Sequence, residues 1–374
     1  MIIDKQKKIL LVQLFSNGDC LYATTIARQI KEDYPGCHLT WAIAGFCKSI
    51  IANNPFVDEV MEVDSVEKND ESAFRKFIKD INKRKSAREF DEVFITHISG
   101  KNQAYYDGSI RSTIFRAYPN PVKVPIRPVL RLFDEEKKKV ENFSLVHNLS
   151  SYKNVLLFEF APLSGQANIT KELAVQIAEN LSVNKDVCVI LSSGNKLQHA
   201  NDNIIDGSVL TLRETAALTH YCTMLIGCSS GITWVSTSDA AKELPMIQIM
   251  NPETNWLNPV SRDFKRFGFN TDSLIELTTI DEKEIINCIE DAIQGFKSAK
   301  EKYNHEIKMN FRTTRNIVYN LLCYFQFAAI RTHIIINRQV YGNRISFYYE
   351  VFMGLITAPF KLIRNVFRKK IFKK

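Results

Sequence analysis

The feature that most constrains the fold is an alternation of short apolar runs with segments of helical period. Strand followed by helix, repeated, is typical of parallel strands joined by crossover helices. The sequence therefore predicts an α/β fold. In the first half of the chain we expect strands at 9–15, 39–44, 57–63 and 92–98 and helices at 21–33, 46–53 and 72–85.

The alternation restarts near residue 154, so the architecture is duplicated. We predict two doubly wound, Rossmann-like domains, 1–150 and 151–305, that face a cleft with ligands at the carboxyl ends of the strands. Residues 103–129, rich in Pro and Arg, are expected to be an irregular region facing a ligand. In the second half we expect strands at 155–160, 187–191, 204–210, 224–226 and 246–250 and helices at 134–142, 169–181, 213–221 and 232–241.

The net charge of +8 is concentrated at one end of the chain. Residues 311–374 hold 12 Lys and Arg against one acid, whereas the rest carries a net charge of −3. Within 357–374, apolar residues including Phe360, Ile363 and Phe367 form one helical stripe opposite cations. We therefore predict a basic, amphipathic helical extension, 306–374, whose end lies in an anionic membrane surface. The alternatives are a helix that packs on the protein and, less favoured, a nucleic-acid-binding arm.

Several protein classes are excluded. The uncharged, largely apolar stretch 316–330 is 15 residues, below the roughly 20 needed to cross a bilayer. The first apolar run is too short for a signal peptide. Eight cysteines occur singly, without CxxC or zinc-type Cys/His spacing, so we expect reduced thiols, no metal, no cofactor and a cytoplasmic protein.

The first expected strand ends in a polar turn, Ser16, Asn17, Gly18 and Asp19. This turn places the carboxylate of Asp19 at the carboxyl end of a strand, where it is a candidate catalytic group. The alternative is structural, with Asp19 as a helix N-cap and Gly18 as the tight-turn residue. His97 ends another strand at the same edge and is a second candidate site residue, or a satisfied structural residue.

Three strands of the second half end in Ser/Gly loops that precede helices or turns. Amides and hydroxyls gathered at one sheet edge favour an anionic, phosphorylated ligand. None of the loops matches GxGxxG or the P-loop pattern, and a tight turn with a Ser N-cap is the alternative for each. The candidates for binding such a ligand are Ser164, Gly165, Ser193, Gly194, Ser229, Ser230, Gly231 and Thr233.

Arginines and tryptophans give weaker signals. An arginine in or near the irregular region is a candidate for an acceptor phosphate, although each alone is more simply a solvated surface charge. These arginines are Arg111, Arg116, Arg127 and Arg131. Trp41, Trp234 and Trp256 are most simply core residues, and Trp256 is also a candidate platform for a base or sugar.

Residues 8–255 resemble glycosyltransferase family 9, the family of the ADP-heptose:lipopolysaccharide heptosyltransferases, which has the GT-B fold. The resemblance rests on Ser-Asn-Gly-Asp at 16–19, Tyr-Pro at 34–35, Asn-Pro-Phe-Val-Asp-Glu-Val at 54–60, and the segments 210–218 and 226–231. It implies an inverting glycosyltransferase of the cell envelope that moves a heptose or related hexose by direct displacement.

The resemblance also implies roles for individual residues. Asp19 matches the general base, and 229–233 match the loop that holds the donor diphosphate, with Glu214 touching the nucleoside. The implied partners are a nucleotide-diphosphate sugar and a lipid-linked or lipopolysaccharide glycan, on the inner face of the cytoplasmic membrane. Ser229 stands where the family usually has Asp, and Trp234 where it has His. The alternatives are a changed donor, a nucleotide-sugar epimerase of the same fold, or a non-catalytic sugar-nucleotide binder.

Overall fold

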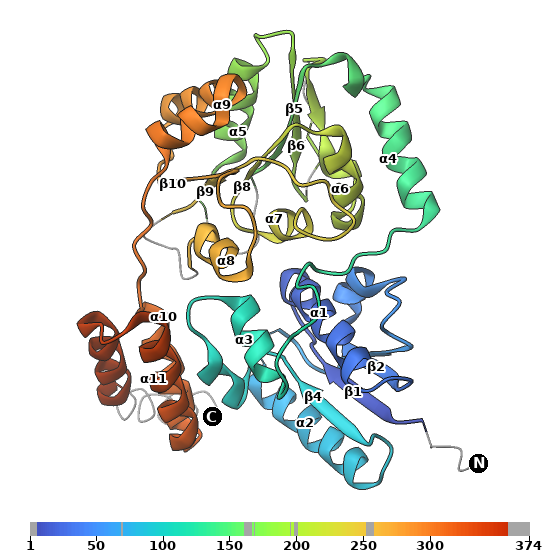
Figure 1. Cartoon of the computed structure of the whole chain (residues 1–374), viewed down its shortest axis with the longest axis vertical. Coiled ribbons are helices and arrows are strands. Elements are labelled where there is room, and N and C mark those ends of the chain that lie inside the picture. Colours follow the sequence, from blue (N-terminus) through green and yellow to red (C-terminus); the bar gives the residue numbers. More distant parts are fainter. Residues whose placement is uncertain are drawn as a thin grey trace, which may run out of the picture.

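The structure is a computed structural model that describes residues 6–68, 70–160, 167, 169–194, 196–197, 201–251 and 258–357. Two α/β domains lie one beyond the other along the long axis of the molecule, and a helical extension lies beside the first of them (Figure 1). The predicted fold class is confirmed, because each domain is built on a parallel sheet with helices on both faces.

The first domain contains a four-stranded parallel sheet in the order β3-β2-β1-β4. Alternate residues of β1 face opposite sides: Ile9 and Leu11 pack with α1, and Leu10 and Val12 with α2. The predicted strands and helices are found, except that 46–53 is a 3-10 helix. The bounds are β1 (Lys8–Val12), α1 (Asn17–Asp33), β2 (His38–Ile43), η1 (Gly45–Ile51), β3 (Glu59–Glu62), α2 (Glu71–Ser86) and β4 (Glu92–Ile95).

The region expected to be irregular, 103–129, is only partly so. It contains the end of the 3-10 helix η2 (Gly100–Tyr105) and the whole of α3 (Ile110–Ala117). The side chain of Ser109 caps α3 by accepting a hydrogen bond from the Ser112 amide at 3.3 Å. This cap and the burial of Ile114 stabilise α3. The helix was not predicted because prolines and arginines surround it in the sequence.

The second domain contains a six-stranded parallel sheet in the order β10-β9-β8-β5-β6-β7. β5 and β6 are buried almost throughout, since helices cover both faces of the sheet. The sequence does not predict β10, α8 and α9, and it predicts a longer helix, 232–241, where α7 lies. The strands are β5 (Asn154–Glu159), β6 (Val187–Ser192), β7 (Ile204–Asp206), β8 (Met224–Gly227), β9 (Met246–Ile249) and β10 (Leu274–Leu277). The helices are α4 (Asp134–Val146), α5 (Lys171–Leu181), α6 (Leu212–Leu218), α7 (Gly231–Val235), α8 (Val260–Phe267) and α9 (Glu282–Tyr303).

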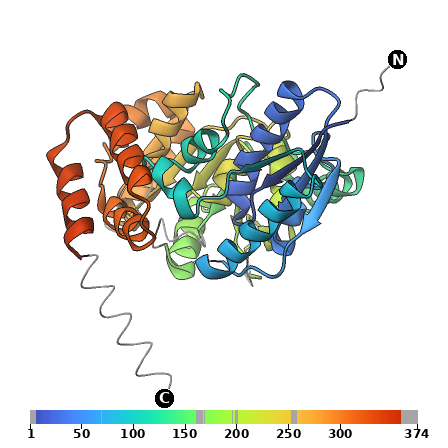
Figure 2. The same ribbon diagram turned by 90° about the horizontal axis from the view of Figure 1, so that it is seen from below.

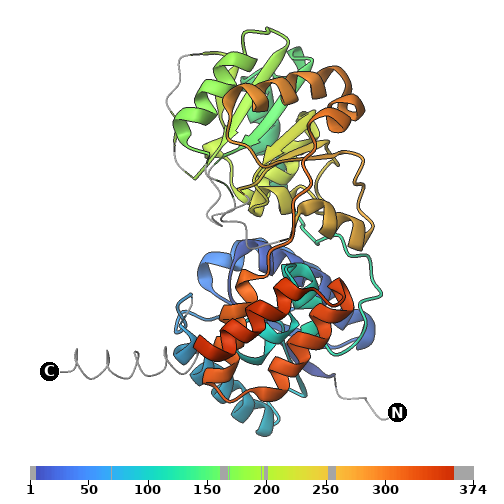
Figure 3. The same cartoon turned by 90° about the vertical axis from the view of Figure 1, so that its left-hand side faces the viewer.

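After α9 the chain returns to the first domain. Helices α10 (Arg312–Cys323) and α11 (Phe327–Tyr341) and a further helix over 345–357 lie against that domain in two perpendicular views (Figures 2 and 3). Their core contains Val318 and Phe347, which cluster with Ala104 and Tyr106 of the first domain. The described part of the extension therefore packs on the protein. Residues 358–374 lie outside the described residues.

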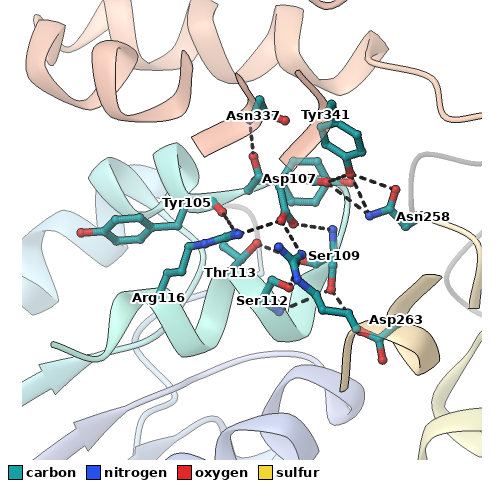
Figure 4. A network of polar contacts seen from close by, with 12 residues as sticks. Tyr105, Asp107, Ser109, Ser112, Thr113, Arg116, Asn258, Asp263, Asn337 and Tyr341 are labelled. Carbon is teal, nitrogen blue, oxygen red and sulfur yellow. Dashed lines mark hydrogen bonds and ion pairs between the residues drawn. The ribbon is translucent and has the colours of Figure 1, made fainter. Parts of the chain in front are cut away.

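A buried carboxylate joins the two domains and the extension (Figure 4). Asp107 is fully buried and accepts hydrogen bonds from Arg116 at 2.9 Å and from Arg266 of α8 at 2.6 Å. The hydroxyl of Tyr341 in α11 donates to its backbone carbonyl. Because one residue bonds all three parts, we expect it to fix their relative orientation. In the described part of the chain, no helix is both long and apolar enough to span a membrane.

Candidate active site

A cavity of about 520 Å³ opens at the carboxyl ends of β1 and β4. The first domain contributes Ser16, Asp19 and His97 to its lining, and α10 supplies the facing wall. Three acceptor-side candidates are thus brought together, whereas Asn17 and Gly18 do not line the cavity. The wall from the extension consists of Thr313, Ile317, Asn320 and Tyr324.

Asp19 lies in the first turn of α1, which begins at Asn17 after Ser16. Its carboxylate makes no capping bond, and it has no hydrogen-bond or ion-pair partner within the described part of the chain. Burial raises the pKa of Asp19 to about 7, and the nearby Lys68 ammonium offsets part of this shift. A carboxylate with a pKa near neutrality is suited to act as a general base.

The turn before α1 obtains its shape from Ser16 rather than from Gly18. Ser16 has φ +40°, an uncommon backbone conformation for a residue with a side chain. Gly18 has no positive φ, and a Cβ placed there would meet no atom within 4 Å. The expectation that Gly18 makes the tight turn is therefore wrong. Gly18 instead leaves open space next to Asp19.

His97 is a neutral hydrogen-bond donor at the cavity wall. Gln13 Nε2 can only donate, and it lies 3.4 Å from His97 Nδ1, so the ring proton belongs on Nε2. Burial lowers the pKa of His97 to about 4. The ring packs against Phe15 and Phe74, with ring centroids 5.3 and 4.9 Å away.

The cavity lining carries more acids than bases. Besides Asp19 it includes Glu67, Asp70 and Glu71, and among the described lining residues Lys68 is the single cation. Asp70 caps α2 by accepting from the Ala73 amide at 2.9 Å, and Glu71 is paired with Arg75 at 3.1 Å. The sequence reading missed this acidic segment because it resembles an ordinary polar loop.

The donor candidates Ser229, Ser230 and Thr233 come together at the start of α7 and are buried. They are held by two polar residues of the sheet that the sequence reading missed. Gln248 Oε1 accepts from the Ser229 amide at 2.7 Å and from Thr233 Oγ1 at 3.1 Å. Ser230 Oγ donates to Glu159. For both residues, the sequence signal that could have found them is a polar side chain inside an otherwise apolar strand.

Glu159 lies where we expected a diphosphate. Burial raises its pKa to about 8, and the amides of Ile232, Thr233 and Cys228 offset part of this shift. At neutral pH the carboxyl is therefore mostly protonated and does not repel an anion. Ser229 Oγ and Gln248 Nε2 are buried and, among the described residues, have no hydrogen-bond partner. Buried polar atoms normally have a hydrogen-bond partner, so these two atoms are consistent with a polar ligand that binds here.

The other donor candidates differ in their surroundings. Ser193 and Gly194 follow β6, and a Cβ at Gly194 would meet no atom within 4 Å. Glu214 caps α6 by accepting from the Thr211 amide at 2.7 Å and pairs with Lys139 at 2.8 Å. Ser164, Gly165 and Trp256 lie outside the described residues. None of the described donor candidates lines the cavity of Asp19.

The expectation of solvated arginines is wrong for Arg111, which is fully buried. Its guanidinium lies between rings of both domains, 4.7 Å from the ring centroid of Tyr22 and 5.6 Å from that of Trp234. Asp263 is 3.4 Å away. Arg116, Arg127 and Arg131 form ion pairs with Asp107, Glu243 and Asp239. Trp41 and Trp234 are buried as predicted.

No protein-family model matches the sequence, and no curated protein does so either. The structure matches that of a glycosyl transferase family 9 protein from Veillonella parvula DSM 2008, with a TM-score of 0.52 and 14% identity over 81% of this chain and 99% of that chain. This chain has the family 9 fold. It also matches E. coli ADP-heptose lps heptosyltransferase II, with a TM-score of 0.51 and 12% identity over 78% of this chain and 99% of that one. The resemblance noted from residues 16–19 and 54–60 is confirmed at the level of the fold.

The described residues contain no group of three or more His, Cys, Asp or Glu side chains placed to hold a metal ion. Reaction without a metal stays a prediction.

Proposed function

We propose that the protein is a glycosyltransferase that moves a heptose or related hexose from a nucleotide-diphosphate sugar to a hydroxyl of a lipid-linked or lipopolysaccharide glycan. The observation that carries this proposal is the unpartnered carboxylate of Asp19. It has a pKa of about 7 and lines a cavity of about 520 Å³ in a chain with the family 9 fold.

The reaction is a single displacement with inversion. The acceptor hydroxyl gives its proton to Asp19 while its oxygen forms a bond to the anomeric carbon of the donor sugar. The bond from that carbon to the diphosphate oxygen breaks on the opposite face, and the nucleoside diphosphate leaves with the electron pair. His97 Nε2 donates a hydrogen bond that orients the acceptor. A positioned base contributes about 10²- to 10⁴-fold to such a reaction.

The donor binds to the second domain. Ser229, Ser230, Gly231 and Thr233 hold the diphosphate, Ser164, Gly165, Ser193 and Gly194 assist, and Glu214 contacts the nucleoside. Two further residues belong to this site: Gln248 supplies a free amide N–H, and Glu159 supplies a protonated carboxyl. The neighbour named as an ADP-heptose transferase supports a nucleoside diphosphate as the leaving group.

The part of the acceptor that enters the cavity carries no phosphate or carboxylate. Among the described residues, the lining has four acids, Asp19, Glu67, Asp70 and Glu71, and one cation, Lys68. Two like charges 4 Å apart near a protein surface repel by about 4 kcal/mol. An uncharged or amino-bearing sugar avoids this repulsion.

The acceptor is anchored in the inner face of the cytoplasmic membrane, where the protein binds peripherally. Residues 357–374, with their seven Lys and Arg and no acid, hold it to anionic lipid. The basic, partly apolar composition of this segment supports this location.

The test begins with thermal unfolding of the protein in the presence of a panel of nucleotide sugars, because a bound donor raises stability by mass action. The stabilising donor is then incubated with neutral, amino-bearing and acidic glycan acceptors, and products are identified by mass spectrometry. Transfer to neutral or amino-bearing acceptors is the expected result. Release of an epimerised sugar without acceptor would indicate an epimerase, and donor binding without any transfer would indicate a non-catalytic binder.

A further inference from the structure

The turn between α10 and α11 exposes large aromatic side chains. Phe325 is 80% exposed, Phe327 61% and Tyr324 44%. Phe325 has φ +55° because it ends α10 in a Schellman motif, in which the Gln326 amide donates to the Leu321 carbonyl at 2.9 Å and the Phe325 amide to the Leu322 carbonyl at 3.0 Å. This cap explains the backbone conformation but not the exposure of three large aromatic side chains in one turn, and a cluster of this kind is typical of an interaction surface.

The helix over 345–357 presents an outward apolar stripe. Ile345, Tyr349, Phe352 and Ile356 are all exposed, at spacings of four, three and four residues, which place them on one face. The opposite face, which includes Phe347, is buried. An amphipathic helix normally turns its apolar face inward, so a second apolar face needs a partner.

The register of this helix against α10 brings the two features together. The ring of Phe347 lies 5.5 Å from that of Phe311, and Glu350 pairs with Arg315 at 2.8 Å. Gly354 lies so close to Val318 that an added Cβ would be 2.8 Å from the Val318 Cβ. The two helices therefore run in the same direction. Residue 357 lies near the end of α10, next to the aromatic turn.

The segment that follows residue 357 indicates which partner covers this surface. Residues 358–374 contain seven Lys and Arg and no Asp or Glu. This basic segment starts where Phe352, Ile356 and the aromatic turn are exposed. Apolar side chains beside a concentration of positive charge fit an anionic bilayer, and the same positive charge opposes docking of a second copy of the chain.

We propose that Tyr324, Phe325, Phe327, Tyr349, Phe352 and Ile356 form a membrane-docking surface that inserts into the interface of an anionic bilayer. Tyr324 belongs both to this surface and to the lining of the Asp19 cavity, so the cavity reaches the surface beside the docking site. A lipid-anchored acceptor enters along α10 without leaving the membrane. This last step depends on the proposed function, but docking itself does not.

The first test is flotation of the full chain with vesicles of phosphatidylcholine, alone or mixed with phosphatidylglycerol. We expect the double variant Phe325→Ser/Phe327→Ser to bind the anionic vesicles at least tenfold more weakly than the parent protein. The control is Leu145→Ser/Val146→Ser, which removes two equally exposed apolar residues from the second domain, 70% and 79% exposed. Equal binding by both double variants would overturn the proposal.

The second measurement uses Phe325→Trp, which keeps an aromatic ring at the turn. Its fluorescence should shift to the blue with anionic vesicles and be quenched by brominated lipid, relative to the parent protein. No change would show that the turn stays in water. A dimer in sedimentation that Phe325→Ser/Phe327→Ser abolishes would assign the surface to a second copy instead, and would likewise overturn the proposal.

Activity measurements separate this inference from the proposed function. The Phe325→Ser/Phe327→Ser variant should transfer sugar normally to a soluble acceptor analogue and at least tenfold more slowly to an acceptor embedded in vesicles. Vesicle binding without transfer to any acceptor would contradict the glycosyltransferase proposal and leave docking intact. Undiminished transfer to the embedded acceptor would contradict docking at the cavity mouth.

Discussion

At the scale of single residues, the Asp19 carboxylate destabilises the fold when it ionises, and the same group is the proposed base of the reaction. Its carboxylate is half-buried at the cavity wall, without a hydrogen-bond partner in the described structure. Substitution Asp19→Asn should therefore lower turnover by about 10²-fold or more and leave donor affinity nearly unchanged. Steady-state kinetics and donor titration measure both quantities. Full specific activity in the variant would show that Asp19 is not the base.

The same substitution should stabilise the fold. The pKa of Asp19 is raised from 3.8 to about 7, so the folded state loses stability as pH rises from about 4 to 7 and the carboxyl must ionise. At pH 8 we expect Asp19→Asn to unfold later than the parent, with a gain on the order of 1 kcal/mol. Urea unfolding at pH 5 and pH 8 tests this, since the gain should be small at the lower pH. A variant that is less stable at both pH values would indicate a structural cap.

The pH dependence of transfer should report the same group. Below a pH of about 7, Asp19 is protonated and cannot accept the acceptor proton, so kcat/KM should fall about tenfold per pH unit. His97 is already neutral throughout this range because burial lowers its pKa to about 4. An acid limb centred near pH 4 would exclude Asp19 as the group that titrates.

Glu159 should limit donor binding at alkaline pH. Its carboxyl, with a pKa of about 8, is protonated at pH 7 and ionises above pH 8, where it repels the diphosphate. Donor affinity should then fall in the parent protein and stay constant in Glu159→Gln. Titration of donor at pH 7 and pH 9 measures the difference. Parallel behaviour of the two proteins would place the diphosphate elsewhere.

At the scale of elements, α10 acts as a wall of the acceptor cavity. Asn320 lines the cavity and donates to Gln103 Oε1 at 3.1 Å, which fixes its amide. Asn320→Ala should raise the KM for acceptor about 3- to 10-fold and leave donor affinity unchanged, because one neutral hydrogen bond is worth about 1 kcal/mol. Asn180→Ala on α5 of the second domain is the control, and an equal effect of both variants would contradict the assignment.

The sequence predicts elements best where burial is uniform. β5 and β6 are apolar over nearly all of their length, so their runs could be recognised without any knowledge of partners. The turn at 16–19 could be recognised because it follows such a run directly. Glu159 and Gln248 could not, since a polar residue in a buried strand has meaning only once its neighbour at the start of α7 is known. The wall formed by α10 could not be predicted either, because it depends on contacts between segments that are far apart in the sequence.

At the scale of the whole molecule, we expect electrostatic attraction to the membrane and the transfer reaction to depend on different parts of the chain. Deletion of residues 357–374 should release the protein from anionic vesicles at moderate salt and preserve transfer to a soluble acceptor analogue. Attraction between exposed charges is screened within about 8 Å at physiological ionic strength, so binding of the intact chain should also weaken as salt rises. Flotation over a salt series checks this. Vesicle binding that changes with neither salt nor lipid charge would contradict the electrostatic contribution of residues 357–374.

The return of the extension to the first domain has a consequence for synthesis of the chain. Asn337 bonds the carbonyl of Tyr106 across 231 residues of sequence, and Phe347 packs in the same cluster as Ala104. Ribosomes add roughly 5–20 residues per second, so about 10 to 50 s pass between the synthesis of Tyr106 and that of its partner. During this interval the nascent first domain lacks one wall. Its apolar surface is then open to chaperones, and the cavity is completed only when the last helices emerge.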